Sequence, residues 1–165
     1  MKRILLIFAW LVCFAITAMA QAKYVFFFIG DGMGSNQVLA AEMYQAALKG
    51  EIGRVPLLMS QFPYSGQAAT FSASYGITDS AAAGTCLASG KKTNNGMIGQ
   101  TPDGELAISV ASQLKTEGWG VGIMSSVPVD HATPASHYAH AEKRYYYYKI
   151  GTQLTQSEFD FFGGG

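Results

Sequence analysis

The apolar residues of this chain gather in short continuous runs separated by glycine-rich or polar segments. Residues 24–29 (Tyr-Val-Phe-Phe-Phe-Ile), 119–124 and 159–162 form three such runs. Apolar runs of this length between turn residues are typical of strands buried on both faces, as in parallel sheets. The pattern therefore predicts three buried strands, and the segment 67–74 also has β character.

Between these runs, the spacing of apolar residues and the turn residues predict helices. The first is capped by Ser35 or Asn36 and ends at Gly50, and the second opens at Asp79-Ser80 and ends at Gly90. In the last helix we expect Thr133 as the cap, Pro134 in the first turn and a possible break further on. The alternation predicts an α/β fold with a mostly parallel sheet flanked by helices. The expected helices are 35–48, 80–89, 106–117 and 135–154.

The N-terminus has the pattern of a signal peptide. Lys2 and Arg3 precede a long apolar run, and Ala18-Met19-Ala20 is a small-residue cleavage pattern, which places the mature start at Gln21. The alternative is an uncleaved membrane anchor. The pattern predicts a periplasmic or secreted protein with a signal peptide at 1–20, a single domain at 21–165 and no stable membrane span after cleavage.

Composition excludes several classes of function. The formal net charge is +0, so no basic face favours nucleic-acid binding. After cleavage Cys86 is the only cysteine, which rules out a disulfide within one mature chain. Three histidines without spaced cysteines do not make a structural zinc site.

The segment Thr78-Asp79-Ser80, followed by a helix of small residues, is the most informative feature for chemistry. A serine at the start of a helix faces the free N–H groups and the positive end of the helix dipole, which suits attack on an anion such as phosphate. Ser, Thr and Asp are also the preferred helix caps, and from these residues alone capping is the commoner role. Both interpretations of Ser80 stay open at this point.

Further polar residues follow the predicted strands, where α/β sheets bind their ligands. Asp31 lies between two glycines and suits a hard metal ligand, although Asp-Gly is also a common turn. Thr133 could offer a hydroxyl to Mg²⁺, and His131 could face a metal or a bound water. Arg144 could hold phosphate oxygens with its planar guanidinium. Taken singly, each also has an ordinary structural role: cap, loop histidine or solvated helix residue.

Taken together, these segments resemble the alkaline phosphatase family. The matching pieces occur in the order of the family and cover essentially all of residues 24–165. The pieces are Phe-Ile-Gly-Asp-Gly-Met-Gly (28–34), Thr-Asp-Ser-Ala-Ala-Ala-Gly-Thr (78–85), His-Ala-Thr-Pro-Ala (131–135), Tyr-Ala-His followed by Arg144, and Gly-Gly-Gly (163–165).

The resemblance implies a role for each matching residue. Ser80 resembles the serine that attacks phosphorus, Arg144 the arginine that holds the phosphoryl oxygens, and Asp79 its acidic neighbour. Asp31 resembles the carboxylate shared by a zinc and the magnesium, and Thr133 the hydroxyl ligand of magnesium. His131 matches a position beside the magnesium site that is Asp or His in the family.

The resemblance further implies hydrolysis of small phosphate monoesters through a phosphoserine, with Zn²⁺ and Mg²⁺ as cofactors. The family extends well beyond the length of this chain, and its other metal ligands lie downstream. We therefore expect the N-terminal portion of such an enzyme, truncated at its C-terminus and inactive or nearly so alone, with a homodimer possible at full length. Alternatives are a non-catalytic domain that binds a cation or phosphate, and a phosphodiesterase of the same superfamily.

Overall fold

A computed structural model describes residues 22–165 of the chain. The expected signal peptide at 1–20 lies outside the described residues. The chain divides into two compact units, one ending at Gly32 and one running from Met33 to Gly165. None of the helices in the described part is both long and apolar enough to cross a membrane.

The first unit contains the apolar run 24–29, and here the sequence-based prediction of a buried strand is wrong. Residues 24–29 form no strand, and Tyr24 and Phe28 are 70% and 87% exposed. A strand exists only through hydrogen bonds to a neighbouring strand. Within residues 22–165, the paired strands are β1 (Gly122–Met124) and β2 (Phe161–Gly163), and neither pairs with this run. The segment 67–74 likewise forms no strand.

The second unit begins with α2 (Ser35–Leu48), which confirms the first predicted helix. Gly34, rather than Ser35 or Asn36, occupies the N-cap position. Gly50 follows the helix with φ +70°, and the N–H groups of Gly50 and Glu51 donate to Ala47 and Ala46. This pair of bonds is the Schellman arrangement, and it explains why a glycine ends the helix.

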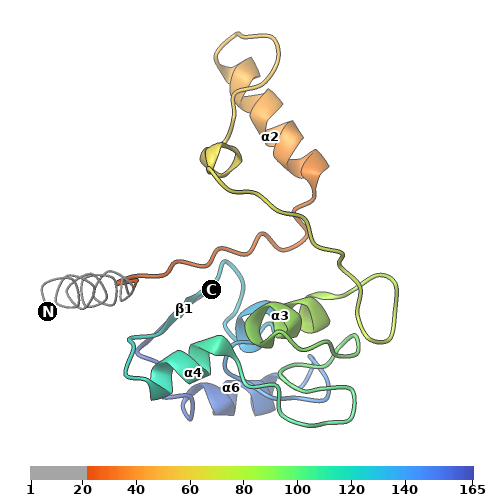
Figure 1. Ribbon diagram of the computed structural model, residues 1–165, viewed down its shortest axis with the longest axis vertical. Helices are drawn as coiled ribbons and strands as arrows, with labels where there is room; N and C mark the ends of the chain where they lie inside the picture. Colours follow the sequence, from red (N-terminus) through yellow and green to blue (C-terminus); the bar gives the residue numbers. More distant parts are fainter. Residues whose placement is uncertain (1–21) are drawn as a thin grey trace, which may run out of the picture. The chain divides into compact units, whose positions relative to one another are not determined.

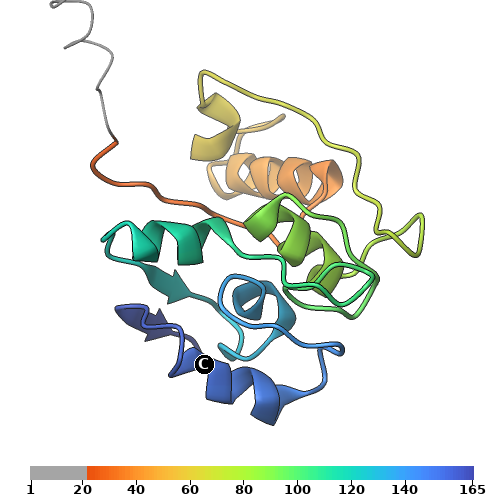
Figure 2. The ribbon, with the colours of Figure 1, turned by 60° about the horizontal axis from the view of Figure 1, so that its bottom comes forward.

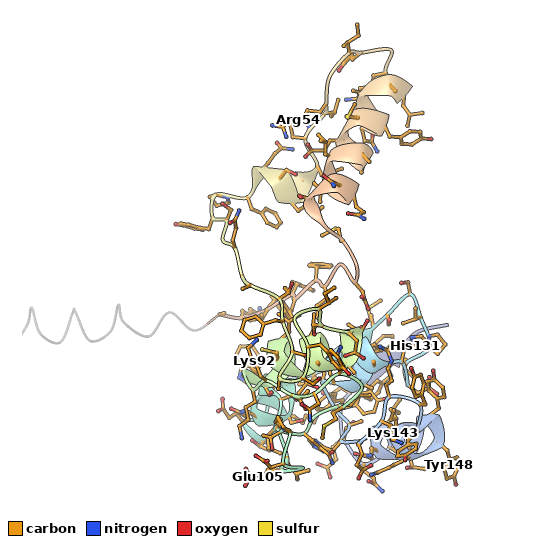
Figure 3. The ribbon with its side chains drawn as sticks, turned by 90° about the vertical axis from the view of Figure 1, so that its right-hand side faces the viewer. Arg54, Lys92, Glu105, His131, Lys143 and Tyr148 are labelled. Carbon is orange, nitrogen blue, oxygen red and sulfur yellow. The ribbon has the colours of Figure 1, made fainter. Side chains whose placement is uncertain are left out.

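A single carboxylate fastens the segment after α2 back onto the helix. Glu42 is 1% exposed and accepts hydrogen bonds from Arg54 (3.3 Å), from the Leu57 N–H (3.1 Å) and from Ser60 Oγ (2.5 Å). Ser60 belongs to the short 3-10 helix η1 (Leu58–Gln61). Helix α2 therefore lies beside η1 and beside the loop that contains Arg54 (Figure 3).

Helices α3 (Ser80–Ser89), α4 (Val110–Thr116), α5 (Ala132–Ala135) and α6 (Tyr147–Leu154) gather with the two strands (Figures 1 and 2). The strands pair in parallel, with Gly122 opposite Phe161 and Met124 opposite Gly163. A parallel sheet flanked by helices confirms the predicted fold class. The strands are shorter than the apolar runs that predicted them.

Two predicted helices are shorter than expected because their ends take part in other pairings. The backbone at 106–107 pairs with the loop at 99–100, so α4 starts only after Ser109, whose Oγ accepts from the Ser112 N–H. Similarly, Ala141 forms an antiparallel bridge with Ile98, which separates α5 from α6. The sequence predicted one helix here with a possible break.

Small residues form most of the core of the second unit, which allows helices to approach closely. Ala81 of α3 packs with alanines around α5 and with Ile98 and Ile150. A Cβ added at Gly84 would lie 2.6 Å from Ser136 Oγ and 3.6 Å from Thr133 Cα. The absence of a side chain at Gly84 is therefore what lets α3 and α5 pack together. Tyr138 closes the core edge-on against Phe162, with ring centroids 5.2 Å apart.

Candidate active site

The N-terminus of α3 carries the candidate nucleophile. Asp79 is the N-cap, and its Oδ1 accepts from the Ala82 N–H at 2.9 Å. Ser80 is the first residue of the helix. The sequence left open whether Ser80 caps this helix. In the structure the Asp79 carboxylate is the cap. Gly90, with φ +72°, ends α3 as predicted.

The second carboxylate oxygen of Asp79 faces an arginine from a distant part of the chain. Asp79 Oδ2 accepts from Arg144 Nη1 at 3.1 Å and from the Gly96 N–H at 3.0 Å. The side chains of Asp79 and Arg144 are 25% and 21% exposed, so the pair is neither buried nor fully solvated. An arginine carries five N–H donors, and this contact uses one. The remaining donor capacity suits an anion at the same place.

The loop containing Asn95 and Gly96 joins these groups. Asn95 Oδ1 accepts from the Asp79 N–H at 3.2 Å, and the Gly96 carbonyl accepts from the Arg144 N–H at 2.7 Å. Sequence reasoning missed both residues. The signal was the Asn-Gly dipeptide, which is typical of turns, in the polar segment after α3.

The candidate metal ligands Thr133 and His131 both belong to the start of α5. The structure corrects the expected cap: His131 occupies the N-cap position and Thr133 lies within the helix, while Pro134 is in the first turn as predicted. The His131 ring stacks on Tyr147 of α6, with centroids 6.1 Å apart and planes at 20°. Close packing of Gly84 against Ser136 and Thr133 brings the start of α5 beside α3.

Asp31, the remaining candidate ligand, lies in the first unit, just before Gly32 with its φ of +69°. Oxygen donors such as the Asp31 carboxylate and the Thr133 hydroxyl suit Mg²⁺, and the His131 imidazole can ligate a metal or contact a bound water. Within residues 22–165, no group of three or more His, Cys, Asp or Glu side chains is gathered to hold a metal ion. Each of these side chains taken singly therefore has donor chemistry that suits a divalent cation.

The other two histidines take part in packing. His140 Nδ1 lies 2.5 Å from the Gly99 carbonyl oxygen, and its backbone is bonded to Gln153. Burial lowers the pKa of His137, whose ring lies against Thr133 O at 3.2 Å. These contacts give both histidines a role in packing.

A helix N-terminus and an arginine guanidinium are both groups that bind phosphate in proteins, and here they lie on a parallel α/β framework. A family model described as "Alkaline phosphatase" matches residues 22–159 of the chain. The chain therefore belongs to the alkaline phosphatase family, which confirms the resemblance stated from its motifs. Members of this family are phosphomonoesterases.

Curated relatives match over most of this chain but over a small part of their own length. The tissue-nonspecific alkaline phosphatase of Gallus gallus is 36% identical over 137 residues, covering 76% of this chain and 26% of the relative. The alkaline phosphatase of Gadus morhua is 32% identical, with coverage of 77% and 29%. The chain thus spans about a quarter to a third of the length of these relatives.

Solved structures give the same result for the fold. The cold-active alkaline phosphatase of Shewanella sp. superposes with a TM-score of 0.73 at 30% identity, covering 81% of this chain and 33% of that one. A histidine-to-aspartate mutant of the TAB5 alkaline phosphatase, described with Mg bound in its M3 site, has a TM-score of 0.57 at 30% identity, with coverage of 65% and 34%.

Proposed function

We propose that this chain carries the nucleophile and the phosphate-binding group of a phosphomonoesterase. Ser80 attacks phosphorus and displaces the alcohol, which leaves a phosphoryl group on Ser80 Oγ. Water then cleaves the Ser80 Oγ–phosphorus bond and releases inorganic phosphate. The observation that carries this proposal is the position of Ser80 at the first residue of α3, next to the ion pair of Asp79 and Arg144.

Each neighbouring group supports this role by its charge. The N-terminal end of α3 is the positive end of a ten-residue helix and favours the negative phosphoryl oxygens. The guanidinium of Arg144 can bind two of these oxygens side by side, while Asp79 fixes its orientation. In a transition state that carries charge on its equatorial oxygens, donors held in place beforehand cost little reorganisation.

The same proposal includes divalent cations. Asp31 and Thr133 would supply oxygen ligands to Mg²⁺, His131 would supply a nitrogen ligand or contact a bound water, and further ligands would complete the zinc and magnesium sites. A divalent cation held there supplies Lewis-acid stabilisation of oxygens that become negative during the reaction. The substrates that we propose are small phosphate monoesters, as expected for the family.

Acid-quenched mass spectrometry tests the nucleophile directly. The purified chain is incubated with p-nitrophenyl phosphate, Zn²⁺ and Mg²⁺, and the peptide containing Ser80 is examined for one added phosphoryl group. We expect the adduct on Ser80 and its loss in Ser80→Ala, even where turnover by the chain alone is very low. Ser89→Ala is the matched control, because it removes a hydroxyl from the other end of α3. An adduct that persists in Ser80→Ala would contradict the proposal.

The location and assembly of the protein complete the proposal. The pattern at residues 1–20 favours export to the periplasm or medium, which N-terminal sequencing of the mature protein would test by finding Gln21 first. A homodimer at full length is tested by the sedimentation velocity of the whole enzyme.

A further inference from the structure

The loop at Asn95 and Gly96 contacts both members of the aspartate–arginine pair. Four hydrogen bonds connect this dipeptide to two separate parts of the chain. One goes to Ile77 and two go to Asp79, both just before Ser80 of α3, and the fourth goes to Arg144, shortly before α6. The most distant partner, Arg144, is 48 residues from Gly96 along the chain. One short loop therefore links two distant parts of the candidate site.

The side-chain amide of Asn95 bridges the backbone just before α3. Its Oδ1 accepts from the Asp79 N–H at 3.2 Å, and its Nδ2 donates to the Ile77 carbonyl at 3.1 Å. The two bonds use the oxygen and one N–H of the amide, so one orientation of the side chain satisfies both. Asn95 thereby fixes the backbone that leads into Ser80.

The backbone of Gly96 connects the aspartate to the arginine. Its N–H donates to Asp79 Oδ2 at 3.0 Å, and its carbonyl accepts from the Arg144 N–H at 2.7 Å. The φ of Gly96 is +85°, a conformation that L side chains rarely adopt. Arg144 is thus attached to this arrangement twice, through its backbone to Gly96 and through its guanidinium to Asp79.

We propose that Asn95 and Gly96 form a positioning element that holds Asp79 and Arg144 in one fixed orientation, and that Asn95 is a positioning residue for phosphate binding. The inference rests on the proposed function only for the identity of the bound anion. A guanidinium that is already oriented loses less freedom when it binds a tetrahedral anion, so orientation raises affinity without a direct contact. A turn that served the fold alone would leave the state of Arg144 unchanged when Asn95 is altered.

The first experiment reads the arginine itself. Nitrogen-15 NMR of the purified chain follows the guanidinium signals of Arg144, which are assigned by their loss in Arg144→Lys. In the wild type we expect hindered rotation at Nη1, because it donates to Asp79. In Asn95→Ala we expect these signals to average, while the amide signals of α4 and α6 keep their positions. Arg144 signals identical to wild type in folded Asn95→Ala would overturn the inference.

The second experiment titrates inorganic phosphate, with Asn94→Ala as the matched control. Within the described residues, Asn94 contributes its backbone carbonyl to a bond with the Met97 N–H, whereas Asn95 contributes its side chain. We expect phosphate affinity to fall about fivefold in Asn95→Ala, the effect of one or two lost hydrogen bonds, and to stay unchanged in Asn94→Ala. Equal affinity in both variants would count against the inference.

A conservative variant keeps the test decisive if Asn95→Ala does not fold. Asn95→Asp retains the acceptor for the Asp79 N–H and loses the donor to Ile77, so we expect an intermediate loss of affinity and partial averaging of the Arg144 signals. Wild-type behaviour in Asn95→Asp would overturn the role of the side-chain donor. If wild-type chain binds no phosphate while the Arg144 signals still respond to Asn95, then the proposed function fails and the positioning element stands.

Discussion

Two carboxylates of this protein each receive three hydrogen bonds, including one from an arginine, yet they are built for different purposes. Glu42 binds Arg54, the Leu57 N–H and Ser60, all within 18 residues of it. Asp79 binds Arg144, the Ala82 N–H and the Gly96 N–H, and its arginine comes from 65 residues away.

Exposure separates the two sites further. The Glu42 side chain is 2% exposed while that of Arg54 is 65% exposed, so the carboxylate is enclosed and its arginine points largely into solvent. At the other site, both partners are about one-quarter exposed. Glu42 therefore serves as a local structural latch, whereas the Asp79 pair joins two distant segments of the chain and both of its side chains are partly shielded from solvent. Exposure of the arginine therefore does not by itself distinguish the two sites. Arg144 differs from Arg54 because its backbone N–H is also bound, to the Gly96 carbonyl, and because its carboxylate partner caps a ten-residue helix.

Removal of each arginine gives the largest expected difference between the two sites. Arg144→Ala should weaken inorganic phosphate binding by about 10- to 100-fold, the range for losing a charged hydrogen-bond donor. Arg54→Ala should leave phosphate affinity unchanged, since Arg54 serves only the latch. Isothermal titration of both variants measures this, and equal losses would remove the functional distinction between the two carboxylates.

Loss of the Asp79 carboxylate should cost stability as well as orientation. Asp79→Ala removes the N-cap of α3, for which we expect a loss of about 1–2 kcal/mol in the free energy of unfolding. Urea denaturation followed by circular dichroism measures the loss. Ser109→Ala removes the N-cap side chain of α4 together with its bond to the His137 carbonyl, and is the control for loss of a helix cap away from Arg144. Only Asp79→Ala should also free the Arg144 guanidinium to rotate, because Asp79 accepts its hydrogen bond.

Alanine substitutions at two glycines distinguish the effect of backbone strain from the effect of positioning Arg144. Gly96 and Gly104 both have φ +85°, and a Cβ at either would meet no atom within 4 Å. Alanine at each should therefore cost about 1 kcal/mol through strain alone. Thermal unfolding compares the stabilities, and phosphate titration should show a loss of affinity for Gly96→Ala but not for Gly104→Ala.

Acid should open the latch at Glu42, the smallest of the expected effects. Hydrogen bonds from Ser60 and the Leu57 N–H, together with Arg54, hold the pKa of Glu42 below its ordinary value of 4.5. Because the folded pKa is the lower one, the stabilisation is present above pH 4.5 and is lost as the pH falls through the folded pKa.

Hydrogen exchange of the Leu57 amide between pH 6 and pH 3, corrected for the intrinsic rate, measures the opening of the latch. In Glu42→Gln the pH-dependent part should disappear. A response at Leu57 that persists in this variant would assign the opening to another group.

Local signals in the sequence predicted the parts that depend on neighbours in the chain. The small-residue helix α3 and its stop at Gly90 follow from capping and glycine chemistry, and the parallel pairing of β1 and β2 follows from their apolar runs. The prediction of a strand at 24–29 was wrong because a strand needs a neighbouring strand to pair with, and the apolar pattern of a segment does not show whether such a neighbour exists. Thr133 is inside α5 because the backbone turns into the helix one residue after His131.

The candidate site shows the same limit. The ordered motifs identified Ser80, Asp79 and Arg144, and the structure brings Asp79 and Arg144 into an ion pair. The bridging role of Asn95 could not be predicted, because it depends on a loop whose path is fixed by contacts with segments 74–79 and 144. The Asn-Gly dipeptide indicated a turn, but it did not indicate which residues that turn would contact.

The Asn95–Gly96 pair is also a sequence at which asparagine can deamidate. Deamidation of an Asn-Gly pair begins when the glycine nitrogen attacks the side-chain amide carbon of the asparagine and expels ammonia, which makes asparagine a heat-sensitive residue. Here the Gly96 N–H is engaged by Asp79, and the Asn95 amide is held by two bonds of its own. The folded loop therefore shields its own most vulnerable bond, and each excursion into the unfolded state exposes it to irreversible damage at the entrance to α3.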